Sequence, residues 1–317
     1  MGDLAHSRVA PQAPLSVHVR VPASSANLGP GFDALGLALA LYNEVVAEEA
    51  DGVEVSVEGE GGGSLPLDER NVVARGIRAA YEAAGRRFPG CRAACINRIP
   101  LARGLGSSAA AWVGGLVAGN ALMGGPLDRA SLLSLAARAE GHPDNVAAAL
   151  YGGLTVSASD GEGATAVALP VPADLRWVAL IPDTPGATAE ARAVLPATVP
   201  RLDAVFNVQR VALLLAALQA RRLDALRAAL ADRLHEPYRQ RLFPWMPEVA
   251  EAARRAGALG CVLSGAGPAL LAVVAGPAGE ADTVARRMQA ALTAAGVGGR
   301  ACVLAPDLEG AVAQVVA

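Results

Sequence analysis

Residues 100–110 (P-L-A-R-G-L-G-S-S-A-A) leave the backbone few choices, because they place glycines and serines between a strand-like segment and a helix pattern. Gly104 and Gly106 lack a Cβ atom, so the chain can turn sharply there or approach another group closely. Ser107 and Ser108 then begin the helix, where unpaired N–H groups and the positive end of the dipole favour an anion such as phosphate. The run predicts a phosphate-binding loop, and an ordinary glycine turn with a serine N-cap also fits it.

Two familiar nucleotide-binding patterns fit this run less well. The Walker A loop needs a lysine after its second glycine, and the chain contains no lysine, which also excludes the ATP-binding lysine of protein kinases. The dinucleotide pattern G-x-G-x-x-G/A is matched by Gly104, Gly106 and Ala109. However, Pro100 interrupts the approaching strand, and the nearest later acid is Asp128. A nicotinamide-dependent oxidoreductase therefore remains an alternative with weaker support.

The composition indicates an ordinary globular protein of the cytoplasm. The 317 residues are 53% apolar and only 3% aromatic, which predicts an alanine, valine and leucine core in one large domain or two smaller ones. A net charge of −3 and scattered arginines favour neither nucleic acid nor a membrane as partner. We expect no secretory signal or membrane span, and the four cysteines form no C-x-x-C pair, so free cytoplasmic thiols are expected.

The sequence predicts a loose tail, residues 1–14, and two domains, 15–169 and 170–317. A Pro-Val-Pro run marks the boundary, and the second part follows a split βαββαβ order. The expected strands are 17–21, 42–48, 53–57, 92–99, 154–157, 165–169, 177–181, 260–263, 269–274 and 301–304. The expected helices are 71–84, 109–122, 128–140, 146–150, 188–194, 202–220, 223–234, 248–256 and 280–294.

Three further stretches gather polar or glycine residues where loops are expected: 22–33, 140–145 and 264–268. The first two are compatible with Asx turns and helix caps, and equally with a substrate-binding loop and a catalytic loop. Their functional side chains are Asn27, Asp33, Glu140, His142, Asp144 and Asn145. Their convergence cannot be read from spacing alone.

Taken in order, these stretches resemble the motifs of the GHMP kinase superfamily. Residues 100–110 are similar to its phosphate-binding motif P-x-x-x-G-L-G-S-S-A-A, and residues 264–268 (S-G-A-G-P) to its third motif. Residues 22–33 and the E-G-H-P-D-N-V-A segment 140–147 are similar to those of the homoserine kinases within it. Residues 188–192 and 236–239 match further positions, so the resemblance covers roughly residues 15–305.

The resemblance implies an α+β two-domain GHMP kinase fold, with an N-terminal α/β domain (ribosomal protein S5 domain 2-like) and a C-terminal ferredoxin-like βαββαβ domain. It implies transfer of the γ-phosphoryl group of ATP to the side-chain hydroxyl of L-homoserine, which gives O-phospho-L-homoserine for threonine biosynthesis. The implied partners are small molecules, and a homodimer is the default assembly. The implied ATP-binding residues are Pro100, Leu101, Ala102, Arg103, Gly104, Leu105, Gly106, Ser107, Ser108, Ala109 and Ala110.

The resemblance also implies roles for the polar residues. Arg192 and Arg239 would bind the substrate carboxylate, for which a guanidinium has a matching fork of donors, and Asp33 would bind its ammonium. Taken alone, each arginine would more often be a solvated surface residue. The residues that would orient the substrate and its hydroxyl are Asn27, His142, Asn145 and Thr188.

The resemblance also implies a metal site and leaves two possible acceptors for the hydroxyl proton. Ser108 and Glu140 are the expected Mg²⁺ ligands, because Mg²⁺ prefers oxygen and keeps several waters. Relatives often carry an acid two helical turns before the histidine, where this chain has Ser134, so Glu140 or water would replace it. Asp144 would accept the hydroxyl proton, or the proton would pass to the phosphate itself.

Two rivals to this reaction lie within the same superfamily. A kinase for another alcohol or acid would not need the combination of Asp33, Arg192 and Arg239, which suits an amino-acid head group. A ligand-binding sensor without catalysis is disfavoured by the intact Ser107–Ser108 pair and Asp144.

Overall fold

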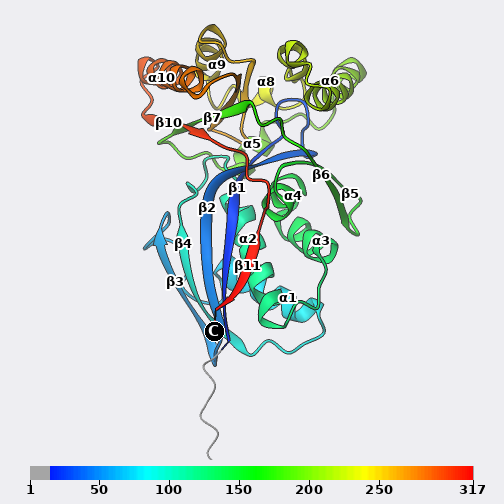
Figure 1. Ribbon diagram of the computed structural model, residues 1–317, viewed down its shortest axis with the longest axis vertical. Coiled ribbons are helices and arrows are strands. Elements are labelled where there is room, and N and C mark those ends of the chain that lie inside the picture. Colours follow the sequence, from blue (N-terminus) through cyan, green and yellow to red (C-terminus); the bar gives the residue numbers. More distant parts are fainter. Residues whose placement is uncertain (1–14, 317) are drawn as a thin grey trace, which may run out of the picture.

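The computed structural model describes residues 15–316, so the predicted tail 1–14 lies outside the described residues. Two β-sheets organise the chain, one in the lower and one in the upper part of Figure 1. The first sheet has the strand order β11-β1-β2-β4-β3, with β5 beside β2 and β6 beside β5. Its strands are β1 (Ser16–Ala26), β2 (Leu35–Glu49), β3 (Gly52–Gly59), β4 (Gly90–Asn97), β5 (Leu154–Ser159), β6 (Ala164–Leu169) and β11 (Val312–Val316).

Helices α2 and α4 pack on β1 and β2, and α1 and α3 pack on α2, so the helices gather on one side of the sheet (Figure 1). The strand pattern explains this: Val17, Val19 and Val21 are fully buried, whereas the alternating His18 and Arg20 are partly exposed. The helices of this domain are α1 (Val72–Ala83), α2 (Ser107–Leu122), α3 (Arg129–Glu140) and α4 (Asp144–Tyr151).

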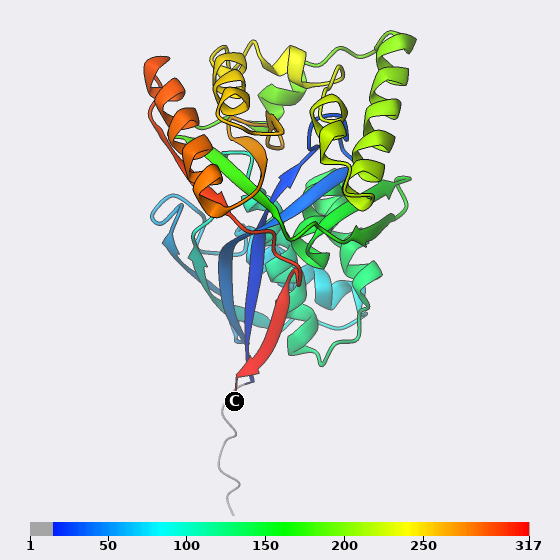
Figure 2. The same ribbon diagram turned by 45° about the horizontal axis from the view of Figure 1, so that its top comes forward.

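The second sheet is antiparallel, in the order β10-β7-β9-β8, and α9 and α10 pack on it. This order confirms the predicted ferredoxin-like domain. Figure 2 shows α10 and α6 standing at opposite sides of it. Its elements are β7 (Leu175–Pro182), β8 (Gly260–Leu263), β9 (Leu270–Ala275), β10 (Gly299–Leu304), α5 (Thr188–Ala193), α6 (Arg201–Gln219), α7 (Leu226–Ala229), α8 (Glu236–Arg239), α9 (Met246–Arg255) and α10 (Ala278–Ala294).

Strand β7 reads as a continuous apolar run because both of its faces are buried. Trp177, Ala179 and Ile181 belong to the large core that also fills the first domain, whereas Val178 and Leu180 pack in a second core beneath α9 and α10. The second sheet is therefore covered on one side by its own helices and contributes to the main core on the other.

Two predicted segments need correction. Residues 22–26, predicted as loop, continue β1 to Ala26, and a shift in register between Pro22 and Ala23 accommodates the proline there. The helix predicted over 223–234 is wrong: a 3₁₀ turn and α7 end at Ala229. The carboxylate of Asp232 instead accepts the N–H groups of residues 234–236, which replaces helical bonds with side-chain bonds.

The last strand was not predicted. Strand β11 pairs antiparallel with β1, with Ser16 opposite Val316, and so returns the chain to the first sheet (Figure 1). The division of the chain at residue 170 stays a prediction, but sheet membership assigns residues 312–316 to the N-terminal domain rather than to the predicted C-terminal range 170–317.

Helix α6 is long and apolar enough, by length and composition alone, to cross a membrane. Only 22% of its most apolar window is buried inside the structure, and the helix carries Asp203 and Arg210. Its exposed apolar side chains include Leu202, Val205 and Val208, spaced three residues apart. Helix α6 therefore has an apolar face that residues 15–316 leave uncovered.

Glycines allow α1 and α2 to lie unusually close together. A Cβ atom on Gly115 of α2 would lie 2.3 Å from the carbonyl oxygen of Val73, and one on Gly76 of α1 would lie 3.0 Å from the Cα of Gly115. The neighbouring Gly114 faces the sheet, where a Cβ atom would meet the side chains of Val45 at 3.3 Å and Val21 at 3.4 Å and no backbone atom. The helix that begins at the phosphate loop is thus held against α1 through Gly115.

We expect Gly115→Ala to lower the free energy of unfolding by about 1–3 kcal/mol, because the clash is with backbone that cannot move independently. Gly114→Ala is the matched control, since it has the same gain in helix propensity of about 1 kcal/mol without the backbone clash. Urea unfolding of the two variants measures the difference. Equal midpoints for both variants would contradict the close-packing argument.

Candidate active site

The predicted phosphate loop leaves β4 through a bend that a buried asparagine holds. The Oδ1 atom of Asn43 accepts hydrogen bonds from the N–H groups of Arg98 (2.9 Å) and Ile99 (3.0 Å). These bonds end the strand at Asn97, two residues earlier than predicted, and turn the chain toward the second domain.

Both loop glycines are required by their surroundings. Gly104 and Gly106 have φ angles of 76° and 69°, in the left-handed region that glycine adopts without strain. A Cβ atom on Gly106 would lie 2.0 Å from Ser24 Oγ, and one on Gly104 would lie 2.2 Å from the carbonyl oxygen of Ser264. The close approach predicted for these glycines is therefore to segments of both domains.

The loop uses its carbonyl groups to dock and leaves its N–H groups free. Within residues 15–316, the N–H groups of residues 104–109 donate no hydrogen bond, and no side chain caps α2. Successive carbonyls, in contrast, each accept one. The carbonyl of Ala102 accepts the N–H of Gly186 (2.8 Å), and the carbonyl of Arg103 accepts the N–H of Ala269 (3.1 Å). The carbonyl of Gly104 accepts the hydroxyl of Ser264 (2.6 Å), and the carbonyl of Leu105 accepts the N–H of Ser24 (3.1 Å). A row of unbonded N–H groups at the start of a 16-residue helix is a site for phosphate.

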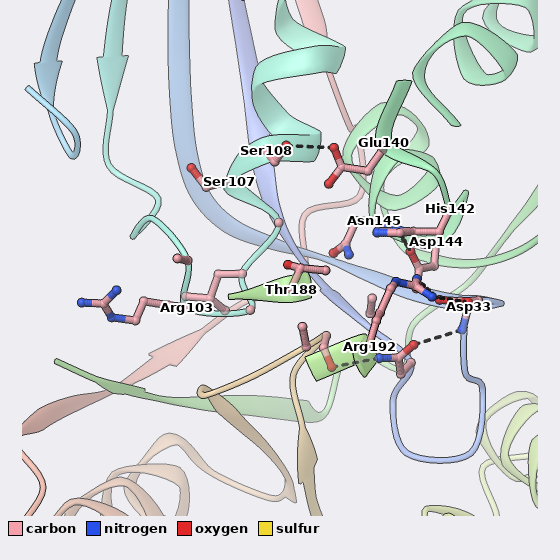
Figure 3. A pocket seen from close by; sticks show the side chains of 18 of the residues that line it. Asp33, Arg103, Ser107, Ser108, Glu140, His142, Asp144, Asn145, Thr188 and Arg192 are labelled. Atoms are coloured by element: carbon pink, nitrogen blue, oxygen red, sulfur yellow. Dashed lines mark hydrogen bonds and ion pairs between the residues drawn. The ribbon is translucent and has the colours of Figure 1, made fainter. Parts of the chain in front are cut away.

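Ser108 meets the end of α3 beside this loop. Its hydroxyl donates to Glu140 Oε2 at 2.8 Å (Figure 3). Burial raises the pKa of the Glu140 carboxyl, and the hydrogen bond from Ser108 offsets only part of this effect. These two oxygen-bearing side chains lie at the wall of the cavity nearest the helix start.

The next wall is formed by the start of α4. His142 Nδ1 lies 2.8 Å from Asp144 Oδ1, which also accepts the N–H of Asn145 at 2.7 Å. Asp144 is almost completely buried, and its Oδ2 has no hydrogen-bond partner among the described residues. Asn145 Oδ1 accepts from Ser24 Oγ at 2.9 Å, so the amide of Asn145 is fixed with its nitrogen as the remaining polar group.

Opposite these residues, Asp33 and Arg192 form a two-pronged ion pair with N···O distances of 2.7 and 3.2 Å (Figure 3). Asp33 is held with a positive φ of 55°, and its N–H donates to Asn27 Oδ1. Asn27 in turn donates from Nδ2 to the carbonyl of Gly265. The loop that carries Asp33 is thus anchored to the second domain.

Arg239 is a second cation in this wall and is only 2% exposed. Its Nε donates to the carbonyl of Ala191 at 3.1 Å, and one terminal nitrogen donates to the carbonyl of Gly265 at 3.0 Å. Burial lowers the pKa of Arg239, and the nearby charge of Arg192 lowers it further. The place between two guanidinium groups is one where a carboxylate would be stabilised.

Two residues missed by sequence reasoning hold this part of the wall. His235 is fully buried; its Nε2 donates to the carbonyl of Gly29 at 2.7 Å, so its Nδ1 accepts from Arg239 at 3.2 Å. Burial lowers the pKa of His235, which favours this neutral form. Phe32 stacks on His235, and both guanidinium groups lie within 6 Å of its ring centre. The H-E-P-Y-R spacing of His235 and Arg239 at i, i+4 was the available signal.

A single cavity brings most of the predicted site residues together (Figure 3). It lies between the two domains. Four residues predicted to bind ATP, Pro100, Leu101, Ala109 and Ala110, do not line it, and the two alanines are buried in the core. The predicted residues that do line it are Asn27, Asp33, Ala102, Arg103, Gly104, Leu105, Gly106, Ser107, Ser108, Glu140, His142, Asp144, Asn145, Thr188, Arg192 and Arg239.

The oxygen donors of the cavity fit a hard divalent cation. Ser108 Oγ and Glu140 Oε2 are adjacent, and the described residues contain no group of three or more His, Cys, Asp or Glu side chains placed for a metal. A metal with few protein ligands and several waters or phosphate oxygens is typical of Mg²⁺. Ser134 contributes nothing here, because its Oγ accepts the N–H of Ala164 and faces β6.

Both parts of the chain match known protein families. Residues 71–153 match the family model of the GHMP kinases N terminal domain, and residues 214–308 match that of the GHMP kinases C terminal domain. The two matches include the phosphate loop, α4, α8 and the 264–268 loop.

The relatives that match over most of the chain are homoserine kinases. The homoserine kinase of Moorella thermoacetica is 48% identical over 294 residues, which cover 93% of this chain and 98% of that protein. The homoserine kinase of Deinococcus radiodurans is 45% identical over 296 residues, covering 93% and 96%. The crystal structure of homoserine kinase from Cytophaga hutchinsonii superposes with a TM-score of 0.87 at 32% identity and covers 98% of this chain and 100% of that one.

The pKa of His142 should depend on Asp144. Burial alone would lower this pKa, but the hydrogen bond to Asp144 and the charge of Asp144 outweigh burial and raise it. The stabilisation from this pair is therefore complete below the unfolded-state pKa of about 6.5 and is lost as the pH rises through the folded-state pKa. In an NMR titration of the histidine rings we expect Asp144→Asn to lower the pKa of His142. An unchanged His142 would contradict the pairing.

Proposed function

Because the chain belongs to the GHMP kinase family and, within it, to the homoserine kinases, we propose that it is an ATP-dependent phosphotransferase that phosphorylates the side-chain hydroxyl of L-homoserine. The observation that carries this proposal is the juxtaposition of an anion-binding loop with an acid and two arginines across one cavity. The product, O-phospho-L-homoserine, would serve threonine biosynthesis.

The phosphate loop would bind ATP through its backbone. The unbonded N–H groups of residues 104–109 supply donors and the positive end of the α2 dipole, and no lysine is required. Ser107 and Ser108 add hydroxyl groups at the same place. The β- and γ-phosphates would therefore lie at the start of α2, close to Glu140.

The ion pair opposite the loop suits the head group of an amino acid. An ammonium group beside Asp33 and a carboxylate between Arg192 and Arg239 would extend the existing pair into a chain of alternating charges. Thr188 lies one helical turn before Arg192 on α5, so both side chains face the same cavity. A substrate with only one charged group would leave Asp33 or Arg239 without a matching partner.

We propose that Asp144 accepts the proton of the substrate hydroxyl while that oxygen attacks the γ-phosphorus and the bond to ADP breaks. Its Oδ1 is occupied by His142 and the N–H of Asn145, which orients the carboxylate and leaves Oδ2 toward the cavity. Asn145 and Asn27 would hold the hydroxyl and the head group in place. Most of the rate enhancement would still come from positioning and charge stabilisation.

The residues that would hold Mg²⁺ are Ser108 and Glu140, with phosphate oxygens and water as its other ligands. When bound, Mg²⁺ supplies positive charge that offsets the negative charge of the phosphates. Glu140 would thus replace the acid that relatives often carry at the position of Ser134.

We further propose that the enzyme acts in the cytoplasm as a homodimer, without a nucleic-acid or membrane partner. The free cysteines support a reducing compartment, and the exposed apolar face of α6 supports self-association. Light scattering after size exclusion should give about twice the chain mass of 31.9 kDa. A mass of one chain would exclude the dimer.

The rival functions differ from this one in their ligands. A GHMP kinase for an acid without an ammonium group would leave Asp33 unused, and a sensor would bind both ligands without turnover. A nicotinamide enzyme would bind NAD at residues 104–109, but the free N–H groups and Ser108–Glu140 pair favour a triphosphate with its metal.

Purified protein should release ADP from Mg-ATP rapidly with L-homoserine and at most slowly with L-serine, L-threonine or mevalonate. The physical reason is that only L-homoserine places both charges at the ion pair and a hydroxyl of the right reach at the phosphate. A coupled ADP assay with the four compounds in parallel measures this. ATP binding without turnover of L-homoserine would remove the proposed substrate while leaving the fold family intact.

Asp144→Asn should reduce kcat by about 10²- to 10⁴-fold, the usual contribution of a general base. Asp203→Asn, on α6 and outside the cavity, where Asp203 pairs with Arg233, is the control and should leave kcat unchanged. Steady-state kinetics at saturating ATP and L-homoserine measure both variants. A kcat for Asp144→Asn within tenfold of wild type would show that the proton passes to the phosphate instead.

A further inference from the structure

Arg103 lies in the middle of the phosphate loop, yet its side chain is engaged elsewhere. Its Nε donates to the carbonyl of Pro182 at 2.8 Å, one terminal nitrogen donates to the carbonyl of Leu101 at 2.7 Å, and the other donates to the carbonyl of Asp183. In Figure 3 the guanidinium points away from Ser108, Glu140 and Asp144. Three of its five N–H donors are thus occupied by backbone carbonyls.

The segment that the Arg103 side chain contacts leads directly to α5, the helix that carries Thr188 and Arg192. Pro182 is the last residue of β7, and α5 begins six residues later at Thr188. Between them, the N–H of Gly186 donates to the carbonyl of Ala102 at 2.8 Å. The connection from β7 to α5 is therefore bonded to the phosphate loop at both of its ends.

We propose that Arg103 is a positioning residue, which ties the β7–α5 connection to the phosphate loop so that nucleotide bound at residues 104–109 fixes the position of Thr188 and Arg192. We call these Arg103 contacts with the β7–α5 connection the clamp. That the two ligands are ATP and L-homoserine rests on the proposed function, whereas the clamp rests only on the contacts. Binding of nucleotide would order the loop, the loop would order the connection, and α5 would then present Arg192 to the amino acid.

The motif alone suggests a different role, because an arginine in a phosphate loop would be expected to contact phosphate. The geometry favours the clamp: the carbonyl of Arg103 accepts the N–H of Ala269 while its side chain reaches β7, so both its ends bind the second domain. A planar guanidinium can reach Pro182, Asp183 and Leu101 at once. A lysine carries its three N–H donors on a single nitrogen and could not reach carbonyls that three separate nitrogens of Arg103 now contact.

The variant Arg103→Met should raise the KM for L-homoserine by at least about fivefold, the lower end of coupling between linked sites, with less than a twofold change in the KM for ATP. Arg103→Lys should show an intermediate KM for L-homoserine. Arg98→Met is the matched control, because Arg98 lies five residues earlier, and its half-exposed side chain pairs with Glu44. It should leave both constants unchanged.

Hydrogen exchange tests the clamp without any turnover. In the wild type, a non-hydrolysable ATP analogue with Mg²⁺ should slow exchange of the amides in residues 183–193, and in Arg103→Met this protection should be lost while that of residues 104–109 remains. This arm needs no L-homoserine, so it stands even if the proposed substrate fails. A rise in the KM for ATP alone would identify Arg103 as a phosphate ligand. That result, unchanged kinetics in Arg103→Met, or no nucleotide-dependent protection of 183–193 in the wild type would overturn the inference.

Discussion

The rest of the structure depends on the phosphate loop, residues 100–110, whose N–H groups and carbonyl groups have different partners. The phosphate loop must turn its N–H groups toward an anion, so its carbonyls need partners elsewhere, because unbonded buried carbonyls are costly. Ser24 supplies one partner from the first domain, and Gly186, Ser264 and Ala269 supply the others from the second. The loop is therefore complete only when both domains are in place, which explains why the cavity lies between them.

On the substrate side of the cavity, buried charged groups need partners just as the buried carbonyls of the loop do. Arg239 is buried, and its cost is offset by carbonyl acceptors, by His235 and by the face of Phe32. The same contacts hold Phe32 beside Asp33, so the acid and the arginines keep a fixed spacing. A preorganised set of opposite charges selects a zwitterion and costs little reorganisation when it binds.

Local chemistry made much of this predictable. The glycines and serines of residues 100–110 predict a phosphate site because backbone conformation and helix-end charge depend on near neighbours, and the strand and helix periods predict most elements. Most of the misses involve partners distant in sequence; the exception is the helix predicted over 223–234, where Asp232 accepts N–H groups two to four residues away. Two of the three carbonyls that hold Arg103 lie about 80 residues away, and β11 pairs with β1 across 300 residues. No local pattern records such pairings.

The most direct test of this account is a crystal structure of the protein with Mg²⁺, a non-hydrolysable ATP analogue and L-homoserine. The account predicts the β- and γ-phosphates within about 3 Å of the N–H groups of residues 106–109, with the ammonium at Asp33 and the carboxylate between Arg192 and Arg239. Phosphates bound away from the start of α2, or a carboxylate that contacts neither arginine, would contradict it.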